Sequence, residues 1–274
     1  MRAAVLGKPI AHSLSPVLHR AAYQALGLDD WSYEAVECDE AGIAAHVTSR
    51  GSDWAGLSLT MPLKRAVLPL LDHADPLATA TGGANTVVFR ADGRYGYNTD
   101  VQGITGALTE AGAGSPGSVL ILGAGATACS ALAAARVLGA AGADVAVRDP
   151  ARAGGLLTAA DRLGLRVRLR DLGEVADERP ELLVSTVPAG AADFYSERIL
   201  ATRQAPAAVL DVVYAPWPTP LATAAGENGA LVAGGFAMLL HQAVAQVELM
   251  TGKPAPVEAM RAAGQAELAR RSMS

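Results

Sequence analysis

The stretch VLILGAGATACSALAAARVLG, residues 119–139, constrains the fold more than any other part of the chain. It predicts an apolar strand, a glycine turn and an alanine-rich helix, and ADVAVRD at 143–149 follows as a second strand. A glycine turn in this position is typical of a parallel sheet with helices on both faces. We therefore expect a Rossmann-like α/β domain over about residues 103–235, with further strands at 181–187, 207–213 and 230–233.

The turn itself fits the pattern G-x-G-x-x-G/A. The first glycine permits a tight turn, the second lets a pyrophosphate approach the backbone, and a small third residue allows close helix packing. The helix N-terminus adds unpaired N–H donors and a positive dipole end. The turn therefore predicts nucleotide binding, and the residues expected to contact the cofactor are Gly123, Ala124, Gly125, Ala126 and Thr127, with Thr186 and Val187 from a later strand end.

The end of the second strand indicates which nucleotide is bound. An acidic residue there favours a free ribose hydroxyl, whereas arginine accommodates a 2′-phosphate. This chain has Arg148, Asp149 and Arg152. Two guanidinium groups outweigh one carboxylate, so the pattern favours NADP over NAD. Asp149 pairing with Arg152, Asp149 repelling the phosphate, and a simple solvated turn all remain open.

Composition excludes several other classes of function. The chain has 274 residues, 51% hydrophobic and 18% charged, which is enough for two packed domains. A net charge of -5 without a basic stripe argues against nucleic-acid or anionic-membrane partners. Cys38 and Cys129 lack metal or redox spacing and are expected to be reduced, so no metal site is predicted. Without a signal peptide or a long apolar run, a cytoplasmic protein is expected.

The first hundred residues predict a second α/β domain. Strands are expected at 2–7, 33–38, 56–60 and 84–89. Between the first two, SPVLHRAAYQALG predicts a helix with Ser15 as its N-cap, Pro16 at its first position and Gly27 at its C-terminal end. This βαβ order favours a mainly parallel sheet.

Two features indicate how the domains are connected. The stretch EAGAGSPGS, residues 110–118, is expected to join two domains, and the helical C-terminal tail can return to cover the first domain. The predicted organisation is a substrate domain, a nucleotide domain and C-terminal helices that pack on the substrate domain, with bounds 1–102, 103–235 and 236–274.

Polar residues gather at the predicted strand ends of the first domain. SLTMPLK, residues 58–64, ends in a lysine, and further polar side chains come from residues 85–86 and 98–100. Ligands collect outside the carboxyl ends of parallel strands, where all of these are expected to lie. Ser13 and Ser15 flank a helix start and favour a carboxylate there, although simple capping is the alternative. Together they predict a site for a small, hydroxylated, anionic substrate facing a nicotinamide.

Seven segments together resemble the shikimate dehydrogenase family almost from end to end. In order they are GKPIAHSLSPVLH, GLSLTMPLK, GGANTV, GYNTDVQG, LILGAGATA, LDVVYAPWPTPL and GGFAMLLHQAVAQVELMTGKPAP. The resemblance implies a substrate domain formed by the N-terminal segment and the C-terminal helices, with an NADP domain between them.

The resemblance also implies roles for individual residues. Lys64 and Asp100 would form the catalytic pair, and Ser13 and Ser15 would bind the substrate carboxylate. The other expected substrate contacts are Thr60, Asn85, Asp100, Tyr214 and Gln242, and the positions beside the nicotinamide are Gly235 and Met238. The fixed φ of Pro62 is expected to stiffen the link between Thr60 and Lys64.

The function implied by the resemblance is NADP-dependent reduction of 3-dehydroshikimate to shikimate in aromatic amino-acid (chorismate) biosynthesis. Alternatives are a relative that uses quinate, an amino-substituted analogue or NAD, and a catalytically silent nucleotide-binding regulator. Three departures from the family pattern are Ser58 in place of a frequent Asn, Ala126 in place of Gly, and VRDPAR in place of N-R-T-x-x-R. Monomer and homodimer are both open.

Overall fold

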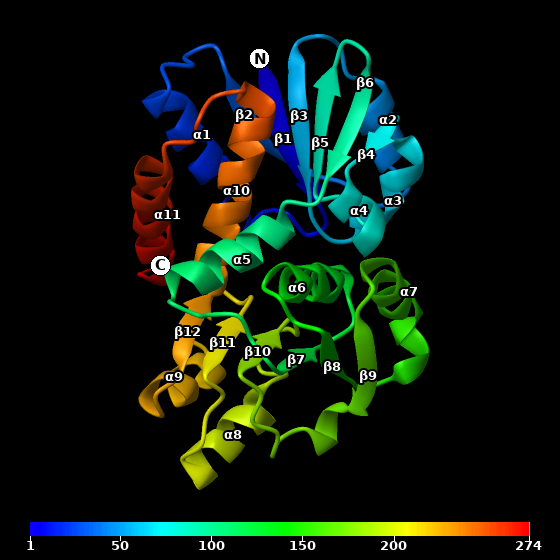
Figure 1. The fold of residues 1–274 in the computed structure, drawn as a ribbon. Coiled ribbons are helices and arrows are strands. Elements are labelled where there is room, and N and C mark those ends of the chain that lie inside the picture. The colour runs from blue at the N-terminus through cyan, green and yellow to red at the C-terminus, as the bar shows by residue number, and fades with distance from the viewer. Residues whose placement is uncertain (274) are drawn as a thin grey trace. The chain divides into compact units, whose positions relative to one another are not determined.

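The computed structural model describes residues 1–273, which divide into two units. The first unit contains residues 1–99 and the C-terminal segment from residue 242, and the second contains residues 100–241. Figure 1 shows the elements of both. The boundaries expected from the sequence fall inside helix α5 (Asp100–Glu110) and just after the first residue of helix α10 (Gly235–Thr251).

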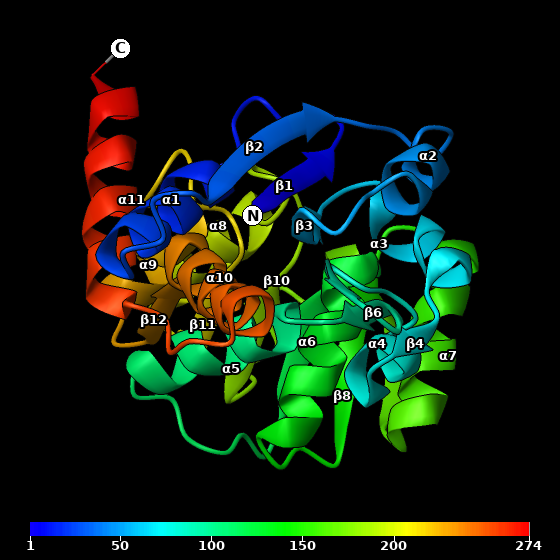
Figure 2. The same ribbon diagram turned by 90° about the horizontal axis from the view of Figure 1, so that it is seen from above.

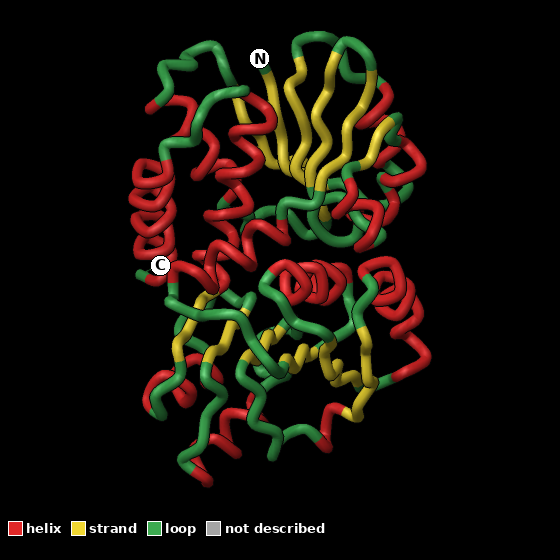
Figure 3. The backbone as a smooth tube through the Cα atoms, viewed as in Figure 1, coloured by secondary structure: helices red, strands yellow, loops and turns green. Residues whose placement is uncertain are grey.

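The first unit is built on a mixed six-stranded sheet, drawn in yellow in the upper part of Figure 3. In spatial order its strands are β2 (Ser32–Glu37), β1 (Arg2–Gly7), β3 (Trp54–Leu59), β5 (Thr86–Arg90), β6 (Gly93–Tyr97) and β4 (His73–Ala74). β1 pairs in parallel with β2 and β3, as expected. The parallel expectation is wrong for β5, which runs antiparallel to both β3 and β6. The connection between β5 and β6 is a two-residue hairpin, too short for a parallel crossover, which explains the antiparallel β5–β6 pairing.

This antiparallel pairing changes which strand ends meet. Thr86, the first residue of β5, pairs with Ser58 near the end of β3 and with Tyr97 at the end of β6. Asn85 therefore lies at the amino end of its strand, and its expected place at a carboxyl end is wrong. It still shares one sheet edge with Thr60, because the strand direction is reversed.

Helices cover both faces of this sheet. One face carries α2 (Ile43–Thr48), α3 (Leu63–Ala66), the 3₁₀ turn η1 (Leu68–Leu70) and α4 (Pro76–Thr81). The opposite face packs against α1 (Ser15–Ala25) and the C-terminal half of α10. Helix α11 (Val257–Ser272) lies beside α1 in Figures 1 and 2. The expected return of the C-terminal helices to the substrate domain is thus confirmed.

Helix α1 begins one residue earlier than expected. Leu14, which is fully buried, is the N-cap, and Ser15 is the first helical residue. Packing of Leu14 in the core therefore determines the helix start, and the N-cap role of Ser15 is wrong. Pro16 consequently occupies the second helical position. Gly27 has a left-handed φ of 64° just past the helix, as expected for a C-terminal glycine.

The second unit contains an entirely parallel six-stranded sheet. In spatial order its strands are β12 (Leu231–Gly234), β11 (Ala208–Asp211), β10 (Leu182–Ser185), β7 (Val119–Leu122), β8 (Gly142–Val147) and β9 (Arg166–Asp171). This is the doubly wound order of dinucleotide-binding folds, so the expected Rossmann-like topology is confirmed. Strand β9 was not expected from the sequence. It is an edge strand, and its alternate arginines give it too little apolar character to be recognised as a strand.

Helices of the second unit flank its sheet. They are α5, α6 (Ala126–Val137), η2 (Pro150–Ala153), α7 (Gly154–Leu163), η3 (Leu172–Glu174), α8 (Asp193–Thr202) and α9 (Pro220–Glu227). The stretch 110–118 connects α5 to β7 within this unit, so its expected role between two domains is wrong. The physical reason is that α5 packs against α6 of the same unit. No helix within residues 1–273 is long and apolar enough to cross a membrane.

Gly235 marks a close backbone contact where β12 passes into α10. A Cβ atom at this position would lie 2.1 Å from the carbonyl oxygen of Val212. We expect Gly235→Ala to lower the free energy of unfolding by about 1 to 3 kcal/mol, because backbone atoms must move apart. Urea unfolding measures the loss. Gly226→Ala is the matched control, since its Cβ would meet only Val232 at 3.6 Å inside helix α9; equal losses would contradict the steric explanation.

His19 is completely buried on α1 and stacks on Tyr33, with ring centroids 4.0 Å apart. Burial lowers the pKa of His19 to about 4, an effect partly opposed by a hydrogen bond to Gln246. The unfolded chain thus binds a proton that the folded chain excludes between pH 6.5 and 4. Stability should therefore fall through this window as the pH is lowered, by up to about 3 kcal/mol from this group.

Replacing His19 by phenylalanine tests this pH dependence. The unfolding free energies of wild type and His19→Phe should converge, or cross in favour of the variant, as the pH falls from about 7 to about 4. A difference that stays constant over this range would show that His19 does not titrate between the two states.

Candidate active site

Thr60 and Lys64 lie where strand β3 ends. The Thr60 amide donates to the Leu6 carbonyl at 2.9 Å, and its own carbonyl accepts from the Leu63 amide at 2.8 Å. These bonds turn the chain into the short helix α3, whose second residue is Lys64. The Lys64 carbonyl accepts from the Ala84 amide at 2.8 Å, which ties the lysine backbone to the segment before β5. The Met61–Pro62 bond in this turn is cis.

Asn85 is held at the same edge by buried hydrogen bonds. Its Oδ1 accepts from the Thr99 amide at 2.8 Å and from the Thr86 hydroxyl at 2.9 Å. Its Nδ2 donates to the Thr99 hydroxyl at 2.9 Å and to Oε1 of Gln242 at 3.3 Å. A backbone N–H can only donate, so the orientation of the Asn85 amide is fixed. The structure thus brings together Asn85 and Gln242, as the sequence predicted for one site.

Asn98 hydrogen-bonds to the segment that precedes Asn85. Its amide nitrogen donates to the Thr81 hydroxyl at 2.7 Å and to the Gly83 carbonyl at 3.1 Å. Asn98 therefore holds the segment that leads into Asn85. Asp100 is the next residue after Thr99, begins helix α5 and is buried, but it belongs to the second unit.

Ser13 and Ser15 lie at the start of α1, which follows the carboxyl end of β1. The Ser15 amide donates to the Ser13 hydroxyl at 3.3 Å. The Ser15 side chain is buried next to the phenol of Tyr33. Burial raises the pKa of Tyr33, and hydrogen bonds with Ser58 and Ser15 oppose that effect. The Ser13 side chain is half-buried just before the helix.

Sequence reasoning missed Gln246, which joins several of these groups. It is fully buried and lies one helical turn after Gln242 on α10. Its amide contacts the side chains of His19, Ser58 and Thr86. The i, i+4 spacing of two glutamines on a mostly apolar helix was the signal that could have identified it. Ser58, noted only as a departure from the family pattern, is part of the same network.

The glycine turn lies at the carboxyl end of β7 in the second unit. Gly123 has a φ of 105°, and a Cβ there would lie 2.7 Å from the Thr186 hydroxyl, so only glycine fits. Gly125 is the N-cap of α6, and a Cβ there would meet no atom within 4 Å. The turn therefore leaves space above the helix N-terminus, as a bound pyrophosphate requires. Ala128 is fully buried, which explains the small third residue of the pattern.

Arg148, Asp149 and Arg152 are exposed just after strand β8. Oδ1 of Asp149 accepts from the Ala151 amide at 3.0 Å and so caps the η2 turn. Within residues 1–273, no ion pair joins Asp149 to Arg152. The carboxylate thus has a local structural role, and both guanidinium groups remain at the surface beside the nucleotide turn. This donor set fits a 2′-phosphate.

The remaining predicted cofactor residues follow other strand ends of the second unit. Thr186 and Val187 come after β10, and the Thr186 hydroxyl donates to the Leu122 carbonyl at 2.7 Å. Gly235 and Met238 begin α10 after β12, and Met238 is buried. Because all strands here are parallel, these residues share one edge with the glycine turn.

Tyr214 is half-buried in the loop after β11. Two contacts of Asp211 fix this loop: its carboxylate accepts from the Val213 amide at 3.2 Å and from the Thr219 hydroxyl at 2.8 Å. Thr219 is in turn the N-cap of α9. Burial raises the pKa of Asp211. The loop is therefore anchored at both ends.

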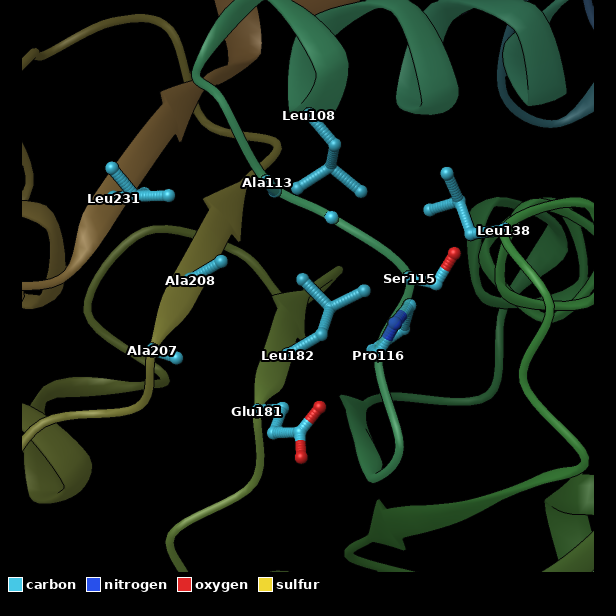
Figure 4. Close-up of a pocket in the computed structure, with 11 residues that line it drawn as sticks. Leu108, Ala113, Ser115, Pro116, Leu138, Glu181, Leu182, Ala207, Ala208 and Leu231 are labelled. Atoms are coloured by element: carbon cyan, nitrogen blue, oxygen red, sulfur yellow. The ribbon is translucent and has the colours of Figure 1, made fainter.

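A cavity of about 170 Å³ lies elsewhere in the second unit (Figure 4). Its lining includes Leu182, Ala208 and Leu231, at the amino ends of β10, β11 and β12. The glycine turn lies at the opposite, carboxyl ends of the same sheet. This cavity is therefore separate from the candidate cofactor site.

Comparisons with known proteins identify relatives over nearly the whole chain. Residues 5–87 match the family described as shikimate dehydrogenase substrate binding domain, and residues 235–263 match the shikimate 5′-dehydrogenase C-terminal domain. The shikimate dehydrogenase (NADP(+)) of Citrifermentans bemidjiense is 38% identical over 97% of this chain and 95% of that protein.

Solved structures also match over nearly the whole chain. Shikimate dehydrogenase from Mycobacterium tuberculosis matches with 44% identity and a TM-score of 0.86, over 97% of this chain and 98% of that one. The enzyme from Thermus thermophilus, solved with NADP(H) and shikimate, matches with 32% identity and a TM-score of 0.83, over 97% and 99%. Fold and near-complete coverage therefore agree, and this chain belongs to the shikimate dehydrogenase family.

Proposed function

We propose that this protein catalyses the NADP-dependent, reversible reduction of 3-dehydroshikimate to shikimate, a step toward chorismate and the aromatic amino acids. The observation that supports this most strongly is the coverage. The chain matches NADP(+) shikimate dehydrogenases almost end to end, and Lys64, Asn85, Asp100 and Gln242 are all present. The first unit, which contains residues 5–87, would bind the substrate, and the second unit would bind NADP.

We call the sheet edge where β3 and β6 end and β5 begins the substrate edge. In this proposal, residues at or next to this edge bind the carboxylate end and the hydroxyl end of the ligand. The hydroxyl groups of Ser13 and Ser15 would donate hydrogen bonds to the carboxylate of shikimate. The ring hydroxyls would meet Thr60, Asn85 and Gln242, whose polar groups are oriented by the hydrogen bonds described above. Tyr214 from the second unit would contact the carboxylate. The expected result is selectivity for a small ring with one carboxylate and several hydroxyls.

NADPH, when bound, supplies the hydride that reduces the ketone carbon. The ketone oxygen then acquires negative charge, and the Lys64 ammonium would stabilise that charge and donate a proton to it. The Asp100 carboxylate would orient the ammonium group and favour its charged form. In the reverse direction, neutral Lys64 would accept the proton of the shikimate hydroxyl as the hydride leaves.

The first experiment measures reduced nicotinamide after mixing the protein with shikimate or quinate and with NADP or NAD. The proposal predicts turnover mainly with shikimate and NADP. Turnover mainly with quinate or with NAD would move the assignment to that relative. No turnover with any pair would favour an analogue substrate or a silent nucleotide-binding regulator.

Replacement of Lys64 by alanine should lower kcat for shikimate oxidation by at least about 100-fold, because the proton-transfer group is lost. The KM for shikimate should change much less. Steady-state kinetics measure both constants. Lys253→Ala, at an exposed lysine after α10, is the matched control and should retain full activity; a Lys64→Ala enzyme of normal rate would contradict the role.

Replacement of Arg152 by alanine should raise the KM for NADP by about tenfold or more, because a guanidinium pairing with the 2′-phosphate is lost. The KM for NAD, which lacks that phosphate, should stay nearly constant. Arg136→Ala removes an exposed cation at the far end of α6 and should affect neither cofactor. An equal rise in the KM for NADP and for NAD would show that Arg152 does not bind the 2′-phosphate.

A further inference from the structure

Gln246 lies at the centre of a buried hydrogen-bonded chain beneath the substrate edge. Its Oε1 is 2.8 Å from the Ser58 hydroxyl of β3 and 3.2 Å from Nε2 of His19 on α1. Its Nε2 is 2.9 Å from the Thr86 hydroxyl of β5. One amide on α10 therefore connects three other elements of the first unit, with no exposure to solvent.

Backbone groups fix the orientation of this amide. Nε2 of Gln246 also lies 3.4 Å from the Asn85 carbonyl oxygen, which can only accept a hydrogen bond. The opposite end must then be the oxygen, which accepts from Ser58 and His19. His19 consequently carries its proton on Nε2, in agreement with its neutral, buried state. A flipped amide would place two oxygens against each other.

The chain continues from Gln246 to Asn85. The Thr86 hydroxyl accepts from Gln246 and donates its own proton to Oδ1 of Asn85 at 2.9 Å. This leaves Nδ2 of Asn85 as the group that faces Gln242. The hydroxyl-binding end of the proposed substrate site is thus connected to Gln246 through a single side chain.

The chain also runs in the other direction. The Ser58 hydroxyl, which donates to Gln246, accepts a hydrogen bond from the Tyr33 phenol at 2.6 Å. Tyr33 in turn stacks on His19, which lies one helical turn after Ser15 on α1. Ser15 belongs to the carboxylate-binding end of the proposed site. The buried hydrogen bonds of Gln246 therefore reach the helix that carries one end of the site and the Asn85 side chain at the other end.

We propose that Gln246 is a positioning residue that fixes the distance and orientation between the two ends of the substrate site. This inference rests on the proposed function. Without the amide, buried donors of Ser58 and His19 lose their acceptor, and such groups rearrange rather than stay unpaired. Both ends of the site then relax, and the affinity for shikimate falls. The nucleotide turn of the second unit has no part in this network.

The test compares Gln246→Met, Thr86→Val and the double variant. Each single change keeps the approximate shape of the side chain and removes its hydrogen bonds. Each should raise the KM for shikimate by about tenfold, corresponding to one net hydrogen bond, while kcat and the KM for NADP change less than about twofold. The double variant should be no worse than Gln246→Met alone, because both changes interrupt the same chain.

Tyr23→Phe is the matched control from the same cluster. The Tyr23 hydroxyl is buried, has no hydrogen-bond partner within residues 1–273, and lies on a ring 6.0 Å from His19. Its removal should leave the KM for shikimate unchanged. A Gln246→Met enzyme that unfolds at lower urea but keeps a normal KM would overturn the proposal, since its role would then be structural only. Additive effects of Gln246→Met and Thr86→Val would overturn it as well.

Failure of the proposed function gives a different result. If the wild-type protein does not oxidise shikimate, the proposed function is contradicted. The hydrogen-bonded network around Gln246 can still be tested. In that case a double-mutant cycle on urea unfolding is measured for the same variants. Coupled losses support the chain, and additive losses overturn it.

Discussion

The reversed direction of β5 is the constraint on which the substrate edge depends. In a purely parallel sheet, residues before a strand lie at the opposite edge from residues after it. Here the antiparallel pairing of β5 with β3 and β6 places the residue before β5 next to the residues after β3 and β6. Asn85 can then be held by the Thr99 amide, which follows β6, without any long connection. The antiparallel pairing of β5 with both neighbours therefore brings three segments of the site together.

Hydrogen bonds from backbone groups provide the precision of this edge. Side-chain amides can flip, and a flip exchanges a donor for an acceptor. The Thr99 amide and the Asn85 carbonyl remove this freedom for Asn85 and Gln246, because each backbone group has one fixed role. Preorganised polar groups of this kind bind a ligand without reordering. In the second unit the turn depends on backbone conformation, because Gly123 has a positive φ and a Cβ there would meet Thr186.

The sequence predicted most of the fold because its signals are local. The glycine turn, its flanking strand and the alanine-rich helix are contiguous, and their topology is the expected one. The direction of β5 and the start of α1 were mistaken, since both depend on tertiary contacts that no local pattern shows: pairing with β3 and β6 for the first, and core packing of Leu14 for the second. Gln246 was missed for the same reason. A glutamine in an apolar helix gives no sign of the three elements it joins until the chain is folded.

The capping bond of Asp149 has an evolutionary consequence. A single carboxylate both stabilises the η2 turn and places a negative charge near Arg148 and Arg152. A substitution at residue 149 that changes cofactor preference therefore also changes the stability of the η2 turn. Asn, Ser and Thr accept the same backbone hydrogen bond without the charge. Drift at residue 149 is then expected to pass through these residues, whereas large apolar residues would lose the turn that carries Arg152.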